Sequence, residues 1–339
     1  MSFNSKIDDL VDFINDAENI VFLGGAGVST ESGIPDFRSK DGLYNKPDIK
    51  FEQFEPEYLL SSYCLYENPK VFYEFYRQKL DTRNAIPNIT HYALAKLEQN
   101  GCNLTIVTQN VDGLHQKAGS KNVLEIHGSS TVCYCRRCGR EYPMEYIFES
   151  KEEIPLCKLC KDEENEYCPL DQAYIRPKVS LYGEFLQPSF KQAQEVIKKA
   201  DLLIVGGTSL KVYPAAGLVM DFLNPVTMKL LGIDKTKRLV IINQQKTDFD
   251  DKANLVFNCS LGKVFNALSE LQYLDMSNQA ARSLFAKRFR NKMLHWDKRD
   301  EYGSYIHLSA TDKTQLNQIL ITASMMSDDD WQKIFNQRQ

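Results

Sequence analysis

Four cysteines arranged as two CxxC pairs are the sharpest chemical signal in this sequence. Cys135 and Cys138 form one pair, and 18 residues later Cys157 and Cys160 form the other. This spacing is typical of zinc ribbons, in which four thiolates complete a tetrahedral Zn²⁺ shell. A shell of four cysteines leaves no open position for water, so the zinc predicted here is structural. A redox dithiol is the alternative, and the nearby Cys133 and Cys168 are spare thiols or alternative ligands.

A histidine and a group of amides occupy positions where catalysis or ligand binding is expected. His127 follows a short apolar run in LEIHGSS, and TQNVDGLH places Gln109, Asn110 and Asp112 after the apolar segment that begins at residue 104. A histidine with a pKa near 6.5 suits a general base, although a lone histidine is more often structural. Amides at the carboxyl end of a strand suit a bound carboxamide such as nicotinamide, and a simple polar turn is the alternative.

Glycines follow the first apolar segment of the chain. Residues 20–23 are apolar, and Gly24, Gly25 and Gly27 come directly after them. A strand, a glycine turn and a polar helix start would open a nucleotide-binding βα unit, in which backbone N–H groups face a phosphate. The G-x-G-x-x-G pattern is incomplete, because Thr30 stands where the third glycine would be. A plain tight turn is therefore the competing interpretation.

Elements that could position these residues alternate along much of the chain. We predict strands over 20–23, 104–110, 201–210 and 238–245, and helices over 6–17, 90–98, 190–199, 214–223 and 261–274, with Thr90 as a candidate N-cap. This rhythm predicts an α/β fold built on a buried parallel sheet. Aromatic residues over 53–80 indicate a small helical module, and 129–176 reads as an inserted cysteine-rich module. Two short helices are expected in the tail, near 279–294 and 327–337.

The composition excludes several classes of protein. With 43% hydrophobic and 25% charged residues, the chain resembles an ordinary globular protein of 339 residues. The net charge of −4 argues against a dedicated nucleic-acid binder. Asp8 and Asp9 interrupt any signal-peptide core, and the apolar runs are far shorter than the ~20 residues that span a bilayer. We expect an intracellular, cytoplasmic protein whose cysteines bind metal or do chemistry.

Taken together, the motifs resemble those of the sirtuin family in their order and in their residues. The resemblance covers roughly residues 5–274. The matching motifs are GAGVSTESGIPDFRS at 25–39, TQNVDGLH at 108–115, HGS at 127–129, the two CxxC pairs, RPKVSLYGE at 176–184, GTSLKVYPA at 207–215 and IIN at 241–243. The resemblance implies a Rossmann-like NAD-binding domain over 1–40, 99–128 and 177–275. It also implies a smaller inserted domain, made of a helical module (41–98) and a four-cysteine zinc-ribbon module (129–176). The C-terminal extension, 276–339, lies outside the resemblance, which assigns it no role.

The resemblance also assigns roles to individual residues. It implies that His127 is the general base and that Asn110 and Asp112 act beside it. The residues implied to bind NAD are Gly25, Ala26, Gly27, Thr30, Ile34, Asp36, Phe37, Arg38, Gln109, Asn110, Asp112, Gly207, Thr208, Ser209 and Asn243. The residues implied to pair with the substrate backbone are Val179, Leu181, Tyr182 and Gly183.

The implied activity is NAD-dependent removal of acyl groups from lysines of other proteins, acetyl groups first. Its products are nicotinamide, O-acyl-ADP-ribose and free lysine. Family members that remove acidic acyl groups carry Tyr-x-x-Arg, whereas this chain has Tyr76 and Lys79 at the matching positions. Lysine lacks the planar fork that grips a carboxylate, so neutral acyl groups are expected. The alternatives are ADP-ribose transfer from the same site, and a non-enzymatic NAD sensor or interaction module.

Overall fold

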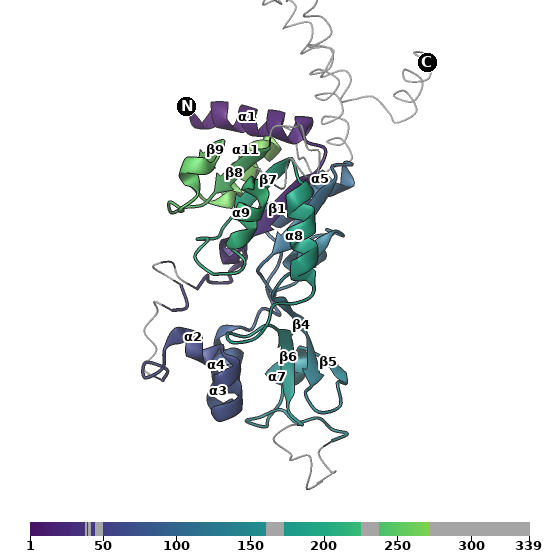
Figure 1. Ribbon diagram of the computed structural model, residues 1–339. Coiled ribbons are helices and arrows are strands. Elements are labelled where there is room, and N and C mark those ends of the chain that lie inside the picture. Colours follow the sequence, from purple (N-terminus) through teal and green to yellow (C-terminus); the bar gives the residue numbers. More distant parts are fainter. Residues whose placement is uncertain (38, 40–41, 45–49, 161–172, 225–236, 271–339) are drawn as a thin grey trace, which may run out of the picture.

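The computed structural model describes residues 1–37, 39, 42–44, 50–160, 173–224 and 237–270 (Figure 1). The predicted tail helices, Arg38 and Cys168 lie outside these residues. The described chain forms two bodies. The larger is a sheet covered by helices, including the N-terminal helix α1, and the smaller holds α2, α3, α4 and α7 together with β4, β5 and β6 (Figure 1).

A six-stranded sheet with the order β3-β2-β1-β7-β8-β9 forms the centre of the larger body. Its strands are β1 (Ile20–Gly24), β2 (Leu104–Thr108), β3 (Val123–Glu125), β7 (Leu202–Gly206), β8 (Arg238–Ile242) and β9 (Leu255–Phe257). Every neighbouring pair is parallel. The carboxyl ends of β2, β1 and β7 are therefore adjacent, since Gly24 lies opposite both Thr108 and Gly206. This is the edge where open α/β sheets bind ligands.

Helices cover both faces of this sheet, which explains why its strands are apolar throughout. Alternate β1 residues point to opposite faces: Phe22 belongs to the core under α1 (Phe3–Asp16), α5 (Ile89–Gln99) and α11 (Leu261–Glu270), whereas Leu23 belongs to the core under α8 (Ser189–Lys199) and α9 (Gly217–Leu223). The fold is thus the predicted Rossmann-like one. Within the described part of the chain, no helix combines the length and apolar character needed to cross a membrane.

The smaller body combines a three-stranded antiparallel sheet with short helices. Its sheet has the order β5-β4-β6, with β4 at Gly128–Cys135, β5 at Glu141–Pro143 and β6 at Ile175–Val179. Its helices are α2 (Pro56–Leu59), α3 (Ser62–Glu67), α4 (Pro69–Lys79) and α7 (Glu145–Phe148). The aromatic residues of α4 are buried against one face of this sheet and the cysteine module. The predicted inserted domain, with a helical and a cysteine-rich module, is therefore confirmed.

Two local predictions are wrong. The N-cap of α5 is Asn88 rather than Thr90, because the Asn88 side chain accepts a hydrogen bond from the Thr90 N–H at 3.0 Å and Thr90 itself is buried. The turn after β1 leads into two 3₁₀ helices, η1 (Ala26–Val28) and η2 (Thr30–Ser32), rather than into an α-helix. Gly33 ends this segment at φ 84°, a conformation that favours glycine, and Pro35 follows it.

Two buried histidines lie where α5 packs against α6 (Leu114–Lys117). The rings of His91 and His115 are 4.7 Å apart and essentially inaccessible to solvent. Burial lowers the pKa of His91 to about 4 and that of His115 to about 3. Both are therefore neutral in the folded protein at pH 7, whereas in the unfolded chain they gain protons below pH ~6.5.

This pair should make the protein sensitive to acid. The unfolded state binds more protons below pH ~6.5, so the free energy of unfolding should fall as the pH drops, by about 2 kcal/mol per histidine at pH 5. Urea titrations at pH 7 and pH 5 measure the effect. His115→Leu should flatten the pH dependence, because it removes one of the two rings that gain a proton on unfolding. Leucine breaks no hydrogen bond there, since neither ring nitrogen of His115 has a partner in the described structure. An unchanged slope in this variant would contradict the prediction.

Candidate functional site

Three loops meet at the carboxyl ends of β1, β2 and β7. The Gln109 N–H, after β2, donates to the Gly24 carbonyl at 3.0 Å. On the other side, the Gly25 N–H donates to the Gly206 carbonyl at 3.0 Å and the Gly27 N–H to the Gly207 carbonyl at 2.8 Å. The predicted glycine turn, the TQNVDGLH segment and the GTSLKVYPA segment are thus joined into one site by backbone hydrogen bonds.

The glycines allow two of these loops to touch through their backbones. A Cβ atom on Gly27 would lie 2.8 Å from the Gly207 Cα atom, and a Cβ on Gly25 would lie 2.7 Å from the Thr208 Cβ. Gly207 also has φ 61°, in the left-handed region. The N–H groups of Gly25 and Gly27 are engaged within the protein, so these glycines shape the loop contact rather than offering their own donors to a phosphate.

Ser29 connects the two polar residues that follow β2. The Ser29 hydroxyl donates to the Asp112 carboxylate at 2.7 Å and accepts a hydrogen bond from the Asn110 amide at 3.0 Å. Asp112 also accepts from the Leu114 N–H at 2.9 Å. Burial raises the pKa of Asp112, while these hydrogen bonds oppose the rise. The Asn110 amide and the Asp112 carboxylate are thereby held by the same hydroxyl in the loop after β2.

The side chain of His127 is oriented by a hydrogen bond from its ring. His127 lies between β3 and β4, and its Nδ1 atom is 2.8 Å from the carbonyl oxygen of Gln109. A carbonyl only accepts, so Nδ1 carries the proton and Nε2 keeps its lone pair when the ring is neutral. Burial lowers the pKa of His127, which favours this neutral form. Nε2 is therefore the atom that could accept a proton.

The other predicted NAD-binding residues, apart from Arg38, belong to the loops that follow β1, β2, β7 and β8. Gln109 donates to Thr208 Oγ1 at 3.2 Å, which links the loops after β2 and β7. Thr30 Oγ1 donates to the Gly27 carbonyl at 3.0 Å. Asn243 lies at the end of β8, and its amide donates to the Gln245 carbonyl at 2.8 Å. Ala26 begins η1, Ser209 follows Thr208, and Ile34, Asp36 and Phe37 lie in the segment after η2.

The predicted substrate segment leaves β6 and runs beside the helical module. Val179 ends β6 opposite Gly128, and the Ser180 N–H donates to the His127 carbonyl at 2.8 Å. The Tyr182 N–H donates to the Leu60 carbonyl, and the Tyr182 carbonyl accepts from the Ser62 N–H, both at 3.0 Å. One edge of this segment is therefore already paired with the chain between α2 and α3.

Sequence analysis missed two parts of this site. Ser29 lies within the GAGVST motif but was assigned no role. Its hydroxyl, directly after the glycine turn, was a usable signal. The chain at 60–62 carried no comparable signal, because its contact with Tyr182 depends mainly on backbone hydrogen bonds, to which the Ser62 hydroxyl adds one of 3.3 Å.

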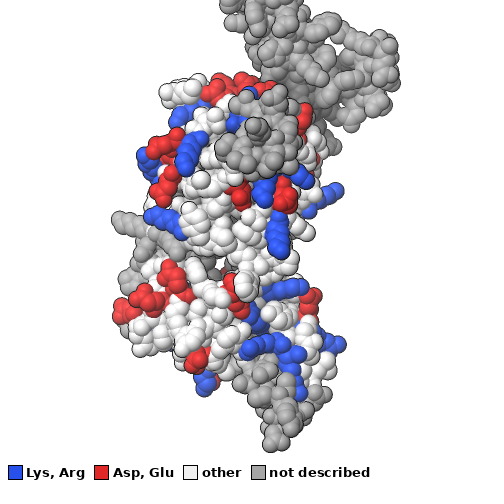
Figure 2. All heavy atoms as spheres, viewed as in Figure 1, with Lys and Arg blue, Asp and Glu red and all other residues white. Residues whose placement is uncertain are grey.

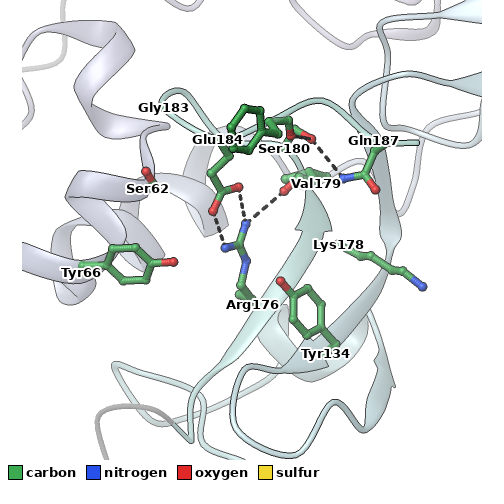
Figure 3. Close-up of a pocket in the computed structure, with 11 residues that line it drawn as sticks. Ser62, Tyr66, Tyr134, Arg176, Lys178, Val179, Ser180, Gly183, Glu184 and Gln187 are labelled. Carbon is green, nitrogen blue, oxygen red and sulfur yellow. Dashed lines mark hydrogen bonds and ion pairs between the residues drawn. The ribbon is translucent and has the colours of Figure 1, made fainter. Parts of the chain in front are cut away.

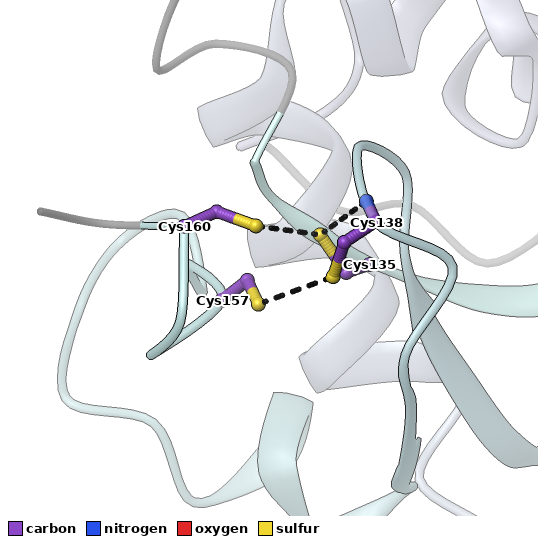
Figure 4. Close-up of side chains that lie close together, drawn as sticks. All are labelled: Cys135, Cys138, Cys157 and Cys160. Atoms are coloured by element: carbon purple, nitrogen blue, oxygen red, sulfur yellow. Dashed lines mark hydrogen bonds between the residues drawn. The ribbon is translucent and has the colours of Figure 1, made fainter. Parts of the chain in front are cut away.

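The four predicted zinc ligands converge at the end of the smaller body (Figure 4). Their sulfur atoms all lie within 4.8 Å of one another. The Cys135–Cys160 distance is 3.9 Å and the Cys138–Cys157 distance 3.8 Å. Thiolates about 2.3 Å from a tetrahedral zinc are about 3.8 Å apart, whereas a disulfide joins sulfurs at about 2.05 Å. The arrangement fits structural zinc, and Cys133 is not among the clustered thiols.

Comparison with known proteins agrees with this geometry. The model of the Sir2 family matches residues 25–214. The NAD-dependent protein deacetylase of Clostridium acetobutylicum is 44% identical over 264 residues, which are 78% of this chain and 98% of that protein. A solved Sir2 variant with deacetylated p53 peptide and 3′-O-acetyl-ADP-ribose is 34% identical, with a TM-score of 0.67. Sir2 with p53 peptide and NAD⁺ is 35% identical, with a TM-score of 0.63. Each structure is covered to 97%, over 78% of this chain.

The chain belongs to the Sir2 family, the sirtuins.

Proposed function

We propose that this protein is an NAD-dependent protein lysine deacetylase. The observation that carries the proposal is the joint placement of His127 and the Ser29–Asn110–Asp112 group at the meeting point of the loops after β1, β2 and β7. Deacetylation that uses NAD needs a base and polar groups for the nicotinamide that leaves, and the placement of His127, Asn110 and Asp112 supports these two roles. Related proteins named NAD-dependent protein deacetylases support the same activity.

The residues of the site divide the work of the reaction. Bound NAD supplies a ribose carbon that the acyl oxygen attacks and a nicotinamide that leaves. Asn110 and Asp112, held by Ser29, are proposed to bind the carboxamide of nicotinamide through paired hydrogen bonds. His127 is proposed to accept a proton at Nε2, because Nδ1 is committed to the Gln109 carbonyl. The loop glycines, Thr208, Ser209 and Asn243 are proposed to line the remainder of the NAD site.

The substrate is proposed to be an acylated lysine in an extended protein segment. Val179 ends β6 and Leu181, Tyr182 and Gly183 follow it, and the same segment contacts His127 through Ser180. An extended peptide laid along this segment would bring its lysine toward His127, in the β-augmentation mode of recognition. A cytoplasmic location is proposed as well, because four thiols clustered at metal-binding distances suit a reducing compartment.

The direct test is mass spectrometry of an acetyl-lysine peptide incubated with NAD. We expect loss of the acetyl group and formation of O-acetyl-ADP-ribose and nicotinamide. ADP-ribose transfer is the alternative, and NAD labelled in its adenosine part separates the two, because transfer leaves the label on protein. NAD binding without either product would favour a sensor instead.

The acyl preference should favour acetyl over succinyl groups. Tyr76 is buried and stacked between Phe72 and Phe148, at 5.7 Å from each ring, so its hydroxyl belongs to the core of the smaller body. A succinyl carboxylate would thus enter the site without the Tyr-x-x-Arg grip. We expect kcat/KM for an acetylated peptide to exceed that for the matched succinylated peptide by about tenfold or more. Lys79→Arg should narrow the ratio, and faster desuccinylation by the wild type would contradict the prediction.

A further inference from the structure

A pocket of about 570 Å³ lies beside the proposed substrate segment, away from the NAD loops. Its walls come from α3, β4, β6 and the loop that follows β6 (Figure 3). Ser62 and Tyr66 approach from the helix, while Tyr134, Arg176 and Lys178 rise from the sheet opposite (Figure 3). Val179 and Gly183 line it as well, so the pocket and the substrate segment share residues.

The two faces of the three-stranded sheet differ in character, and the pocket lies on the polar one. Cys133, Cys135 and Ile175 point into the aromatic core that α4 covers. Tyr134 lies opposite both Glu141 and Arg176 across the sheet, and Lys178 follows Arg176 on the same face of β6. No described helix of the smaller body covers this polar face as α4 covers the apolar one; Tyr66 of α3 contributes only one wall.

The charges around the pocket leave an excess of positive charge. Arg176 is buried and neutralised by Glu184 through two hydrogen bonds of 2.6 and 2.8 Å. Lys178 meets Glu141 at 2.6 Å, but the two side chains are 51% and 57% exposed, and such pairs exchange partners at little cost. Arg136 does not line the pocket but lies 4.1 Å from the ring centre of Tyr66, which does. Its charge helps to lower the pKa of Glu184, but it forms no direct ion pair with a carboxylate among the described residues. Basic side chains also predominate over this part of the visible surface (Figure 2).

A large apolar side chain stands at the rim of the pocket. Phe185 lines the pocket and is 98% exposed, although it lies one residue from the tightly held Glu184. A single exposed ring is common on protein surfaces, but this one stands beside cations and a hollow, and aromatic and arginine side chains are the types enriched at protein-binding surfaces.

We propose that this pocket binds an acidic side chain of the substrate protein, close in sequence to the acylated lysine. Lys178 and Arg136 would attract the carboxylate, and Phe185 would pack against an apolar part of the same segment. The inference rests on the proposed deacetylase function and adds a preference to it: acetyl-lysines flanked by Asp or Glu are the better substrates.

The test uses acetyl-lysine peptides in which one position at a time carries Glu or its neutral isostere Gln. With the full-length protein at low salt, one or two positions on one side of the lysine should show a Glu/Gln ratio of kcat/KM of about three to ten. This range corresponds to the energy of one or two partly exposed ion pairs. The ratio should approach one in 0.5 M NaCl, because salt screens exposed charges.

Variants connect the preference to the pocket. Lys178→Glu should bring the ratio to one or below, Lys178→Gln should give an intermediate ratio, and Arg136→Gln should lower it as well. Lys121→Glu, an exposed residue between α6 and β3, is the control with the same change of charge and should keep the wild-type ratio. Zinc content and melting temperature report whether the Arg136 variant keeps its fold.

The outcomes separate the inference from the proposed function. Failure to deacetylate any peptide would overturn the function. Deacetylation with equal Glu and Gln rates at every position, or a preference that Lys121→Glu abolishes equally, would overturn the inference alone. The inference would also be overturned if Lys178→Glu weakened binding of a single-stranded oligonucleotide while leaving the Glu/Gln ratio unchanged.

Discussion

Replacing His127 with alanine should lower kcat/KM for an acetyl-lysine peptide by about 10²–10⁴-fold, the range expected for loss of a general base. His127 is half-buried among the loops, and its Nε2 is the ring nitrogen left to accept a proton. NAD binding should survive, because the Ser29–Asn110–Asp112 group does not include His127. Deacetylation rates by mass spectrometry and NAD titration by calorimetry test the two halves separately.

A second variant distinguishes proton transfer from positioning. His127→Gln can still donate a hydrogen bond to the Gln109 carbonyl but has no basic nitrogen. If His127 acts as the base, this variant should be about as inactive as the alanine variant. Recovery of most activity would assign His127 a positioning role instead. The pKa of His127 is lowered by burial, so the acid limb of the wild-type kcat/KM profile should lie below the ordinary histidine pKa of about 6.5.

Replacing Cys157 with serine should release the zinc and unfold the smaller body. Structural zinc sites contribute about 10–16 kcal/mol of apparent binding free energy, which exceeds the stability of most domains. The sulfur of Cys157 lies in the cluster, and the cysteines pack into the same core as the aromatic residues of α4. We therefore expect loss of about one equivalent of zinc, a lower melting temperature and loss of deacetylation.

Cys133→Ser is the matched control for this prediction. Cys133 is equally buried and lies two residues from a ligand, but its sulfur is not among the four that cluster. Zinc content by elemental analysis should stay at the wild-type value in Cys133→Ser and fall in Cys157→Ser. Zinc loss from both variants would show that Cys133 takes part in binding, and zinc retained by Cys157→Ser would contradict the four-cysteine site.

Features that depend on local sequence could be predicted. The short apolar runs, such as 202–206, became central strands because strands buried on both faces need no polar alternation. The two CxxC pairs predicted the metal cluster because each pair brings its own two sulfurs together through local sequence. Only the meeting of the two pairs then depends on the fold. The resemblance to the sirtuin family predicted that the separate motifs belong to one site.

Features that depend on distant contacts could not be predicted. The Ser29 hydroxyl meets residues 81 and 83 positions away, and no spacing rule indicates which hydroxyl fills such a place. The helix expected after β1 was replaced by 3₁₀ turns whose backbone is fixed by the loop after β7. The observed N-cap of α5, Asn88, lies two positions before the predicted Thr90, which is within the usual uncertainty of helix boundaries.

The pairing of Tyr182 with Leu60 and Ser62 has a consequence for motion. Because its N–H and carbonyl are both bonded to the chain between α2 and α3, this part of the substrate segment is tethered to the helical module rather than to the six-stranded sheet. Any rigid-body movement of the helical module would therefore move this part of the substrate segment as well. The Tyr182 amide should then exchange with deuterium at the opening rate of the helical module, and more slowly once a peptide occupies this segment.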